Sequence, residues 1–211
     1  QNWKSAVLIV LAFVGIYIVR TVVSVAVQGV SDGSGMQYVK EWAAMFKNPM
    51  MWLNIAALPI NYFFVFIAFF GEEYGWRYYL QPVLQKRFGL RAGVIILGVV
   101  WGLWHIPDDL FYYTQTSGIQ MIFAQQITCI SLGIFFAYAY MKTQNIWVPV
   151  CLHYLNNNLI PIISGTFSAD VLENQTVSWK DLPVALVLNG LCFGFFLLAD
   201  VFKKKEVQEE E

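Results

Sequence analysis

Long apolar runs, separated by short polar stretches, make up most of this chain. Most runs reach the roughly 17–25 residues that a helix needs to cross a bilayer. Within a bilayer the backbone must satisfy its own hydrogen bonds, and runs without apolar–polar alternation do so as helices rather than barrel strands. The pattern therefore predicts an all-α, polytopic integral membrane protein, a bundle of about six transmembrane helices over Ser5–Val27, Met50–Phe70, Ala92–Ile106, Ile119–Met141, Ile146–Ile163 and Leu182–Phe202.

We expect residues 1–211 to form a single transmembrane domain that ends in a solvated, charged tail at 203–211. The first apolar run is too long for a signal peptide, and no small-residue cleavage site follows it. Because the chain begins with Gln1 rather than Met, further helices before this residue are left open. No internal repeat and no soluble domain is visible in the sequence.

Local signals refine the expected helix ends. The second span continues through polar residues to about Phe88, where Gly89 offers a C-cap. The third span stops at Pro107-Asp108-Asp109, a pattern typical of a helix start, so a new segment is expected there. The stretch Lys40–Lys47 is compatible with a short amphipathic helix on the membrane surface.

Composition agrees with a lipid environment. Hydrophobic residues make up 58% of the chain and charged residues 13%, about half the share found in soluble domains. The net charge of −1, without a basic stripe, excludes nucleic acid as a partner. The expected partner at this level is the membrane lipid bilayer.

The distribution of lysine and arginine predicts the orientation of the bundle. With six crossings, one face carries Lys4, Lys142 and most other basic residues, and the opposite loops carry acidic ones. Cytoplasmic loops are enriched in lysine and arginine, so both termini are predicted in the cytoplasm. Lys40 and Lys47 run against this trend. The remaining basic residues on the first face are Lys86, Arg87, Arg91 and Lys203–Lys205, and the acidic ones opposite are Asp108, Asp109, Asp170, Glu173 and Asp181.

The cysteines and one arginine lie inside predicted spans. Cys129, Cys151 and Cys192 are odd in number and far apart, which fits neither a disulfide framework nor a metal-binding spacing. We interpret them as small apolar packing residues. Arg20 has no partner that the sequence identifies, and its long side chain is able to snorkel outward.

Three polar groups interrupt the spans: Glu72–Arg77, His105 and His153–Asn157. Ionisable residues in a membrane span are costly, so each group is a functional-site hypothesis. Residues four apart share a helix face, so Glu73 is predicted to pair with Arg77. Glu72 points elsewhere and has no basic residue three or four positions later, so it is left unpaired within its own helix, which suits a general base.

Each group also has a plainer interpretation. The two glutamates could lie in water at a helix end, His105 could be a satisfied core residue, and His153 with Asn157 could be an ordinary interhelical hydrogen-bonding pair. Depth favours a common site: eleven to fourteen residues separate each group from a basic residue on the cytoplasmic face. At 1.5 Å per helical residue these separations are roughly 16–21 Å, so the three groups could share one level.

The three groups resemble a known family. EEYGWRYYLQPVLQKRFG from Glu72, WGLWHIP around His105, and His-x-x-x-Asn at 153–157 are similar to the motifs of the CPBP family of intramembrane proteases, related to the Rce1-like type II CAAX prenyl endopeptidases, also called ABI proteins. The resemblance covers roughly residues 67–163. Trp101 stands where the family usually has Phe, and Tyr78 where a small residue often follows Trp-Arg.

The resemblance implies an intramembrane endopeptidase with a cavity open to the cytoplasm. It implies that Glu72 and His105 activate the attacking water, that His153 and Asn157 stabilise the oxyanion, and that Glu73 with Arg77 holds the site together. The implied substrate is a membrane-associated protein or peptide, either CAAX-type or a small bacteriocin-like peptide. The implied location is a bacterial or archaeal plasma membrane, favoured over the eukaryotic endoplasmic reticulum.

Metal use and two other function classes stay open. Many relatives carry the label metalloprotease, and a zinc ion would be bound by Glu72, His105 and His153. The HExxH signature is absent and Asn157 is a poor zinc ligand, so we favour glutamate-type hydrolysis without a cofactor. The alternatives are a catalytically silent immunity or regulatory protein of the same fold, and a transporter with Arg20 on its path, although transporters usually show repeats.

Overall fold

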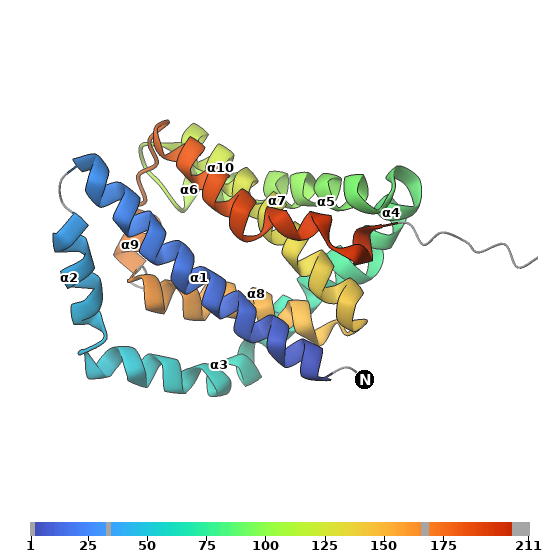
Figure 1. Ribbon diagram of the computed structural model, residues 1–211, viewed down its shortest axis with the longest axis horizontal. Coiled ribbons are helices and arrows are strands. Elements are labelled where there is room, and N and C mark those ends of the chain that lie inside the picture. The colour runs from blue at the N-terminus through green and yellow to red at the C-terminus, as the bar shows by residue number, and fades with distance from the viewer. Residues whose placement is uncertain (1–2, 33–34, 166–168, 204–211) are drawn as a thin grey trace, which may run out of the picture.

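The computed structural model describes residues 3–32, 35–165 and 169–203, and within these ranges the chain is helical without any strand (Figure 1). The predicted all-α fold is confirmed. Residues 204–211 of the predicted charged tail lie outside the described ranges. The helices are α1 (Trp3–Asp32), α2 (Gly35–Met45), α3 (Pro49–Glu73), the π-helix η1 (Tyr74–Leu80), α4 (Gln81–Phe88), α5 (Leu90–Trp104), α6 (Ile106–Phe111), α7 (Gly118–Thr143), α8 (Trp147–Ser164), α9 (Ala169–Glu173), α10 (Asp181–Cys192) and the 3-10 helices η2 (Gly194–Leu198) and η3 (Asp200–Phe202).

Four helical stretches within the described residues are long and apolar enough to cross a membrane: Trp3–Val27, Pro49–Phe88, Leu90–Phe111 and Gly118–Thr143. They identify a polytopic membrane protein. The fifth predicted span is helix α8. The sixth differs from a single long helix, because α10 has only 12 residues and the chain continues as η2 and η3, separated by an extended residue at Ala199.

Helices α3, η1 and α4 follow one another without a break and end at Phe88, where the sequence predicts. Tyr74 and Gln81, at the two junctions, keep right-handed helical dihedral angles, and Gly89 ends this helical stretch with a φ of 91°. The π-helical stretch directly after the two glutamates was not predicted. A π-turn holds more residues than an α-turn, so it changes which side chains share a face, and such turns are frequent at functional sites.

Helices α5 and α7 approach closely through glycine. A Cβ atom on Gly98 would lie 2.6 Å from the Cα of Ile130, and one on Gly133 would lie 3.4 Å from the Cα of Gly98. Small residues allow membrane helices to pack backbone against backbone. This packing sets the end of α5, and with it His105, beside the middle of α7.

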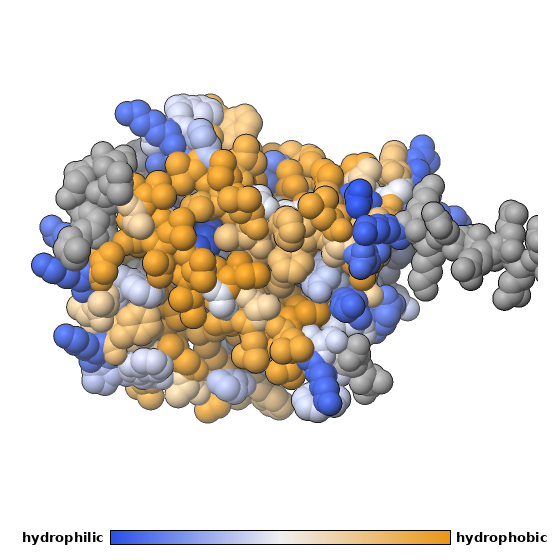
Figure 2. Space-filling model, viewed as in Figure 1, coloured by the Kyte–Doolittle hydropathy of each residue, from blue (hydrophilic) through white to orange (hydrophobic). Residues whose placement is uncertain are grey.

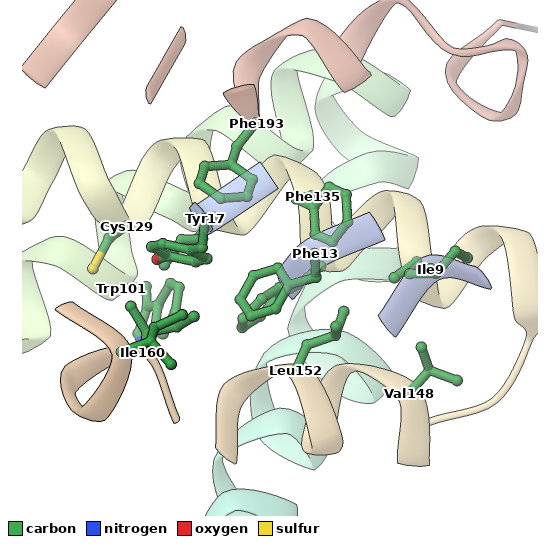
Figure 3. Close-up of a cluster of buried hydrophobic side chains, with 14 of the residues drawn as sticks. Ile9, Phe13, Tyr17, Trp101, Cys129, Phe135, Val148, Leu152, Ile160 and Phe193 are labelled. Carbon is green, nitrogen blue, oxygen red and sulfur yellow. The ribbon is translucent and has the colours of Figure 1, made fainter. Parts of the chain in front are cut away.

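Aromatic rings fill the centre of the bundle (Figure 3). The ring of Phe13 on α1 lies 5.6 Å from Phe135 and 6.0 Å from Phe136, both on α7, and 5.9 Å from Phe193 after α10. Each well-oriented ring pair adds about 0.5–1.5 kcal/mol beyond the area it buries. The cluster holds α1 and the C-terminal segment against α7.

Candidate functional site

Glu73 lies at the centre of a buried ionic cluster. Arg77 donates through Nε to Glu73 Oε2 at 2.9 Å, so the predicted pairing is confirmed. The other carboxylate oxygen, Oε1, lies 2.9 Å from Nδ1 of His153. The three side chains are at most 4% exposed. A buried carboxylate engaged through both oxygens ties the π-helix η1 to α8.

The indole ring of Trp101 connects this cluster to His105. The guanidinium carbon of Arg77 lies 5.2 Å from the Trp101 ring centroid and 5.5 Å from that of Phe136. The Trp101 ring also lies 5.5 Å from the His153 ring and 5.7 Å from the His105 ring. Cations over aromatic faces are stabilised where water is scarce. The sequence signal for this role was the four-residue spacing between Trp101 and His105.

His105 is held in one tautomer by its own helix. Its Nδ1 lies 2.8 Å from the carbonyl oxygen of Trp101. A carbonyl oxygen only accepts hydrogen bonds, so Nδ1 carries a proton. Nε2 makes no hydrogen bond within the described residues, and it holds a lone pair whenever the ring is neutral. The ring also stands nearly perpendicular to Trp104, at a centroid distance of 5.0 Å. A half-buried imidazole with a free Nε2 is suited to accept a proton.

Glu72 points away from the ionic cluster. Its Oε2 is buried and has no hydrogen-bond partner in the part of the chain that the structure describes. Trp76, one helical turn after Glu72, contacts Trp104, the neighbour of His105, with ring centroids 6.2 Å apart. The elements that carry Glu72 and His105 therefore touch. A buried acceptor without a donor is a place where an ordered water binds.

Asn157 is exposed, whereas His153 one turn earlier is buried. Four residues advance an α-helix by about 400°, so the two side chains leave α8 only about 40° apart. Asn157 Oδ1 accepts a hydrogen bond of 2.9 Å from Asn156 Nδ2, and Asn156 in turn accepts from the hydroxyl of Tyr17. The amide nitrogen of Asn157 has no partner within the described residues and is free to meet a substrate.

Two residues near His105 were not predicted as part of the site. The sulfur of Cys129 lies 3.7 Å from His105 Nδ1. The prediction that Asp109 lies in an outer loop is wrong: α6 folds against α7 and buries this carboxyl fully, with both oxygens unpartnered in the described structure. Asp109 follows His105 by one turn, which was its sequence signal; nothing marked Cys129.

The three residues named for the zinc alternative do not gather into a metal site in the described structure. No three His, Cys, Asp or Glu side chains among the described residues lie close enough to share one ion. One nitrogen of His153 contacts Glu73, and one nitrogen of His105 contacts the Trp101 carbonyl. As placed, Glu72, His105 and His153 do not fit a three-ligand zinc site.

Known proteins share the segment that carries this cluster. The sequence profile of the family described as "Type II CAAX prenyl endopeptidase Rce1-like" matches residues 53–159, which include every predicted site residue. A CAAX prenyl protease 2 from Methanococcus maripaludis is 27% identical over 125 residues, covering 55% of this chain and 45% of the relative. The aligned segment thus spans about half the length of that curated relative. No solved structure matches the chain.

Proposed function

We propose that this chain, which belongs to the Rce1-like family of type II CAAX prenyl endopeptidases, is an intramembrane endopeptidase. The observation that carries the proposal is the hydrogen bond of His105 Nδ1 to the Trp101 carbonyl, which leaves Nε2 as a proton acceptor. The unpartnered, buried Oε2 of Glu72 lies on the adjoining helix. A carboxylate and an imidazole together can deprotonate a water molecule.

In the proposed reaction, a water bound between Glu72 and His105 Nε2 gives up a proton to this pair. Its oxygen attacks the carbonyl carbon of the scissile peptide bond, and the carbonyl oxygen takes up the negative charge. The C–N bond then breaks, and the proton taken from the water passes to the leaving amine. The products are one peptide with a new carboxyl end and one with a new amino end.

The surroundings of His153 suit it to stabilise the oxyanion. Ionised Glu73 only accepts hydrogen bonds, so Nδ1 of His153 carries a proton. Nε2 can then donate to the oxyanion when the ring is an imidazolium. In that state Arg77 and His153 contribute two positive charges against the single negative charge of Glu73. The net charge of +1 complements the oxyanion, and the exposed amide of Asn157 can supply a second donor.

We propose a membrane-associated protein or peptide as the substrate, either CAAX-type or small and bacteriocin-like. The cavity would open to the cytoplasm, with both termini on that side. Support comes from the gathering of basic residues at one end of the bundle, where Arg91 and Lys203 line a common cavity with Phe88 and Phe202. We also propose a bacterial or archaeal plasma membrane as its location, as the resemblance of the site motifs implies.

A cleavage assay in lipid nanodiscs tests the proposal. Wild type should cleave a prenylated CAAX-type reporter peptide. Glu72→Gln should lower the rate by about 10²–10⁴-fold at unchanged melting temperature. Glu41→Gln is the matched control, because Glu41 is exposed on α2 and contacts only Gln37 among the described residues. Equal rates in wild type and Glu72→Gln would refute the catalytic role; folded wild type that cleaves nothing would favour the regulatory alternative.

The same assay addresses metal dependence. We propose hydrolysis without zinc, so activity should persist after treatment with 1,10-phenanthroline, while a zinc protease in the same buffer loses its activity. Loss of cleavage that returns on addition of Zn²⁺ would show that the site gathers into a metal centre.

A further inference from the structure

Arg20 is a charge in the apolar part of α1 that the proposed reaction does not use. Its Nε is buried without a hydrogen-bond partner, and no ion pair to it occurs among the described residues. Its guanidinium lies 5.8 Å from the ring of Tyr17, its nearest aromatic neighbour in the described structure. An arginine within a membrane span is costly unless a partner or water compensates its charge. A partner that is not part of this chain would offset that cost.

Arg20 lines a cavity of about 390 Å³ between α1 and α10. Ser24 lies one turn further along α1, and Lys180 and Asp181 enter from the start of α10. The carboxylate of Asp181 already accepts a hydrogen bond of 2.8 Å from the backbone N–H of Ser178. Arg20 and Lys180 carry two positive charges and Asp181 one negative charge, so the cavity has a net charge of +1. This charge complements a ligand with one negative charge. The other lining residues are apolar: Val27, Val184, Ala185 and Leu188.

An apolar groove of about 380 Å³ continues from this cavity along α1. It is lined by Val22, Val23, Ala26 and Val27, and Val27 also lines the charged cavity. Val22, Val23 and Val27 are 38–47% exposed. Figure 2 shows a hydrophobic face over α1 and α10 that is interrupted by a small hydrophilic spot between them. A charged cavity that joins an apolar groove matches an amphiphile with an anionic head.

The end of the cavity at Lys180 lies at the depth of a phospholipid headgroup. Trp179, which is 55% exposed, directly precedes Lys180 at the start of α10. Exposed tryptophan marks the interface between headgroups and hydrocarbon, and basic residues at that level attract anionic lipids. The groove along α1 would then lie in the acyl-chain region next to the headgroup.

We propose that this cavity binds an anionic phospholipid of the surrounding bilayer. The lipid phosphate lies between Arg20 and Lys180, and one acyl chain follows the groove over Val22, Val23 and Ala26. The charge of the cavity selects against a zwitterionic headgroup, whose choline would meet two cations. This assignment does not depend on the proposed protease activity.

Lipid binding is measured by native mass spectrometry of the purified full chain with an equimolar mixture of phosphatidylglycerol and phosphatidylcholine of the same acyl chains. Wild type should bind phosphatidylglycerol about tenfold better. Arg20→Gln and Lys180→Gln should each abolish this preference, and Arg91→Gln, an exposed arginine at the other end of the bundle, should keep it. Should Arg20→Gln fail to fold, Lys180→Gln decides, because Lys180 is exposed.

Two further measurements distinguish binding of a lipid from binding of a free anion. Ala26→Phe fills the groove and should weaken phosphatidylglycerol binding at least fivefold, whereas excess inorganic phosphate should leave lipid binding unchanged. The proposal is overturned if wild type binds both lipids equally, if both charge variants keep the preference, or if inorganic phosphate displaces the lipid as an ordinary competitor.

Discussion

The two histidines receive different chemistry from their hydrogen-bond partners. His105 donates from Nδ1 to the carbonyl oxygen of Trp101, and its Nε2 has no hydrogen-bond partner among the described residues. His153 donates from Nδ1 to the carboxylate of Glu73. In the proposed reaction the first histidine serves as the proton acceptor and the second as a donor to the oxyanion.

Substitution of each histidine by glutamine should separate these roles. His105→Gln removes the proton acceptor and should lower kcat by about 10²–10⁴-fold. His153→Gln removes one oxyanion donor and should lower kcat by about 10²–10³-fold. The double variant should lose less than the product of both effects, because residues that act as a unit are not additive. Fully multiplicative losses in single-turnover cleavage, with unchanged melting temperatures, would contradict one shared site.

Arg77 should matter for stability before it matters for activity. Arg77→Met leaves the buried carboxylate of Glu73 with His153 as its remaining partner, and breaking a buried ion pair from one side costs about 3–5 kcal/mol. Adding Glu73→Gln should recover part of this loss, since the stranded charge is then removed. Asp200→Asn serves as the control, because the Asp200–Lys203 pair is exposed and its loss should leave unfolding in detergent unchanged. The stabilising role of the pair would be refuted if Arg77→Met lowered the stability only slightly and the addition of Glu73→Gln lowered it further.

At the scale of the helices, local sequence rules predicted the contacts and the ends that a single helix determines. The Glu73–Arg77 pairing, the end of α4 at Gly89 and the new helix at Pro107 all follow from spacing and capping. The contact of His153 with Glu73 joins residues 80 positions apart. It depends on how α8 packs against α3, and no spacing along the chain encodes that packing.

Other features were missed for related reasons. The π-helix η1 depends on a local hydrogen-bond shift that no residue type announces. The burial of Asp109 depends on α6 folding against α7, whereas its acidic neighbourhood suggested an outer loop. Apart from the π-helix η1, predictions therefore held where a single helix decided the outcome and failed where two elements had to meet.

The glycine contact between α5 and α7 should control the position of His105. At Gly98 a methyl group would lie 2.6 Å from the backbone of Ile130, which cannot rotate away. Gly98→Ala should therefore push the helices apart and cost about 1–3 kcal/mol, as overpacking does. Cleavage activity should fall with it, because His105 at the end of α5 moves relative to Glu72.

Gly190→Ala on α10 is the matched control. A methyl group there meets nothing within 4 Å, so the variant should be neutral or gain up to about 1 kcal/mol from helix propensity. Thermal unfolding and cleavage rates of both variants provide the comparison. If both glycines tolerate alanine equally, the close approach of α5 and α7 does not hold the site.

At the scale of the whole molecule, the basic residues divide the bundle into two ends. Arg91 and Lys203 line a common cavity at one end, and Lys142 stands in the last turn of α7. Thr176 lies in the connection before α10, at the end where Lys180 and Asp181 begin that helix. Because lysine and arginine are retained on the cytoplasmic side, the first end should face the cytoplasm.

Single cysteines introduced at Lys86 and Thr176, both exposed, test this orientation in intact cells. A membrane-impermeant maleimide should label Thr176→Cys from outside, and Lys86→Cys only after lysis. The native cysteines are buried or half-buried, and the unmodified chain measures their background. The opposite labelling pattern would place the basic end outside the cell, and a cytoplasmic CAAX-type terminus could not then be the substrate.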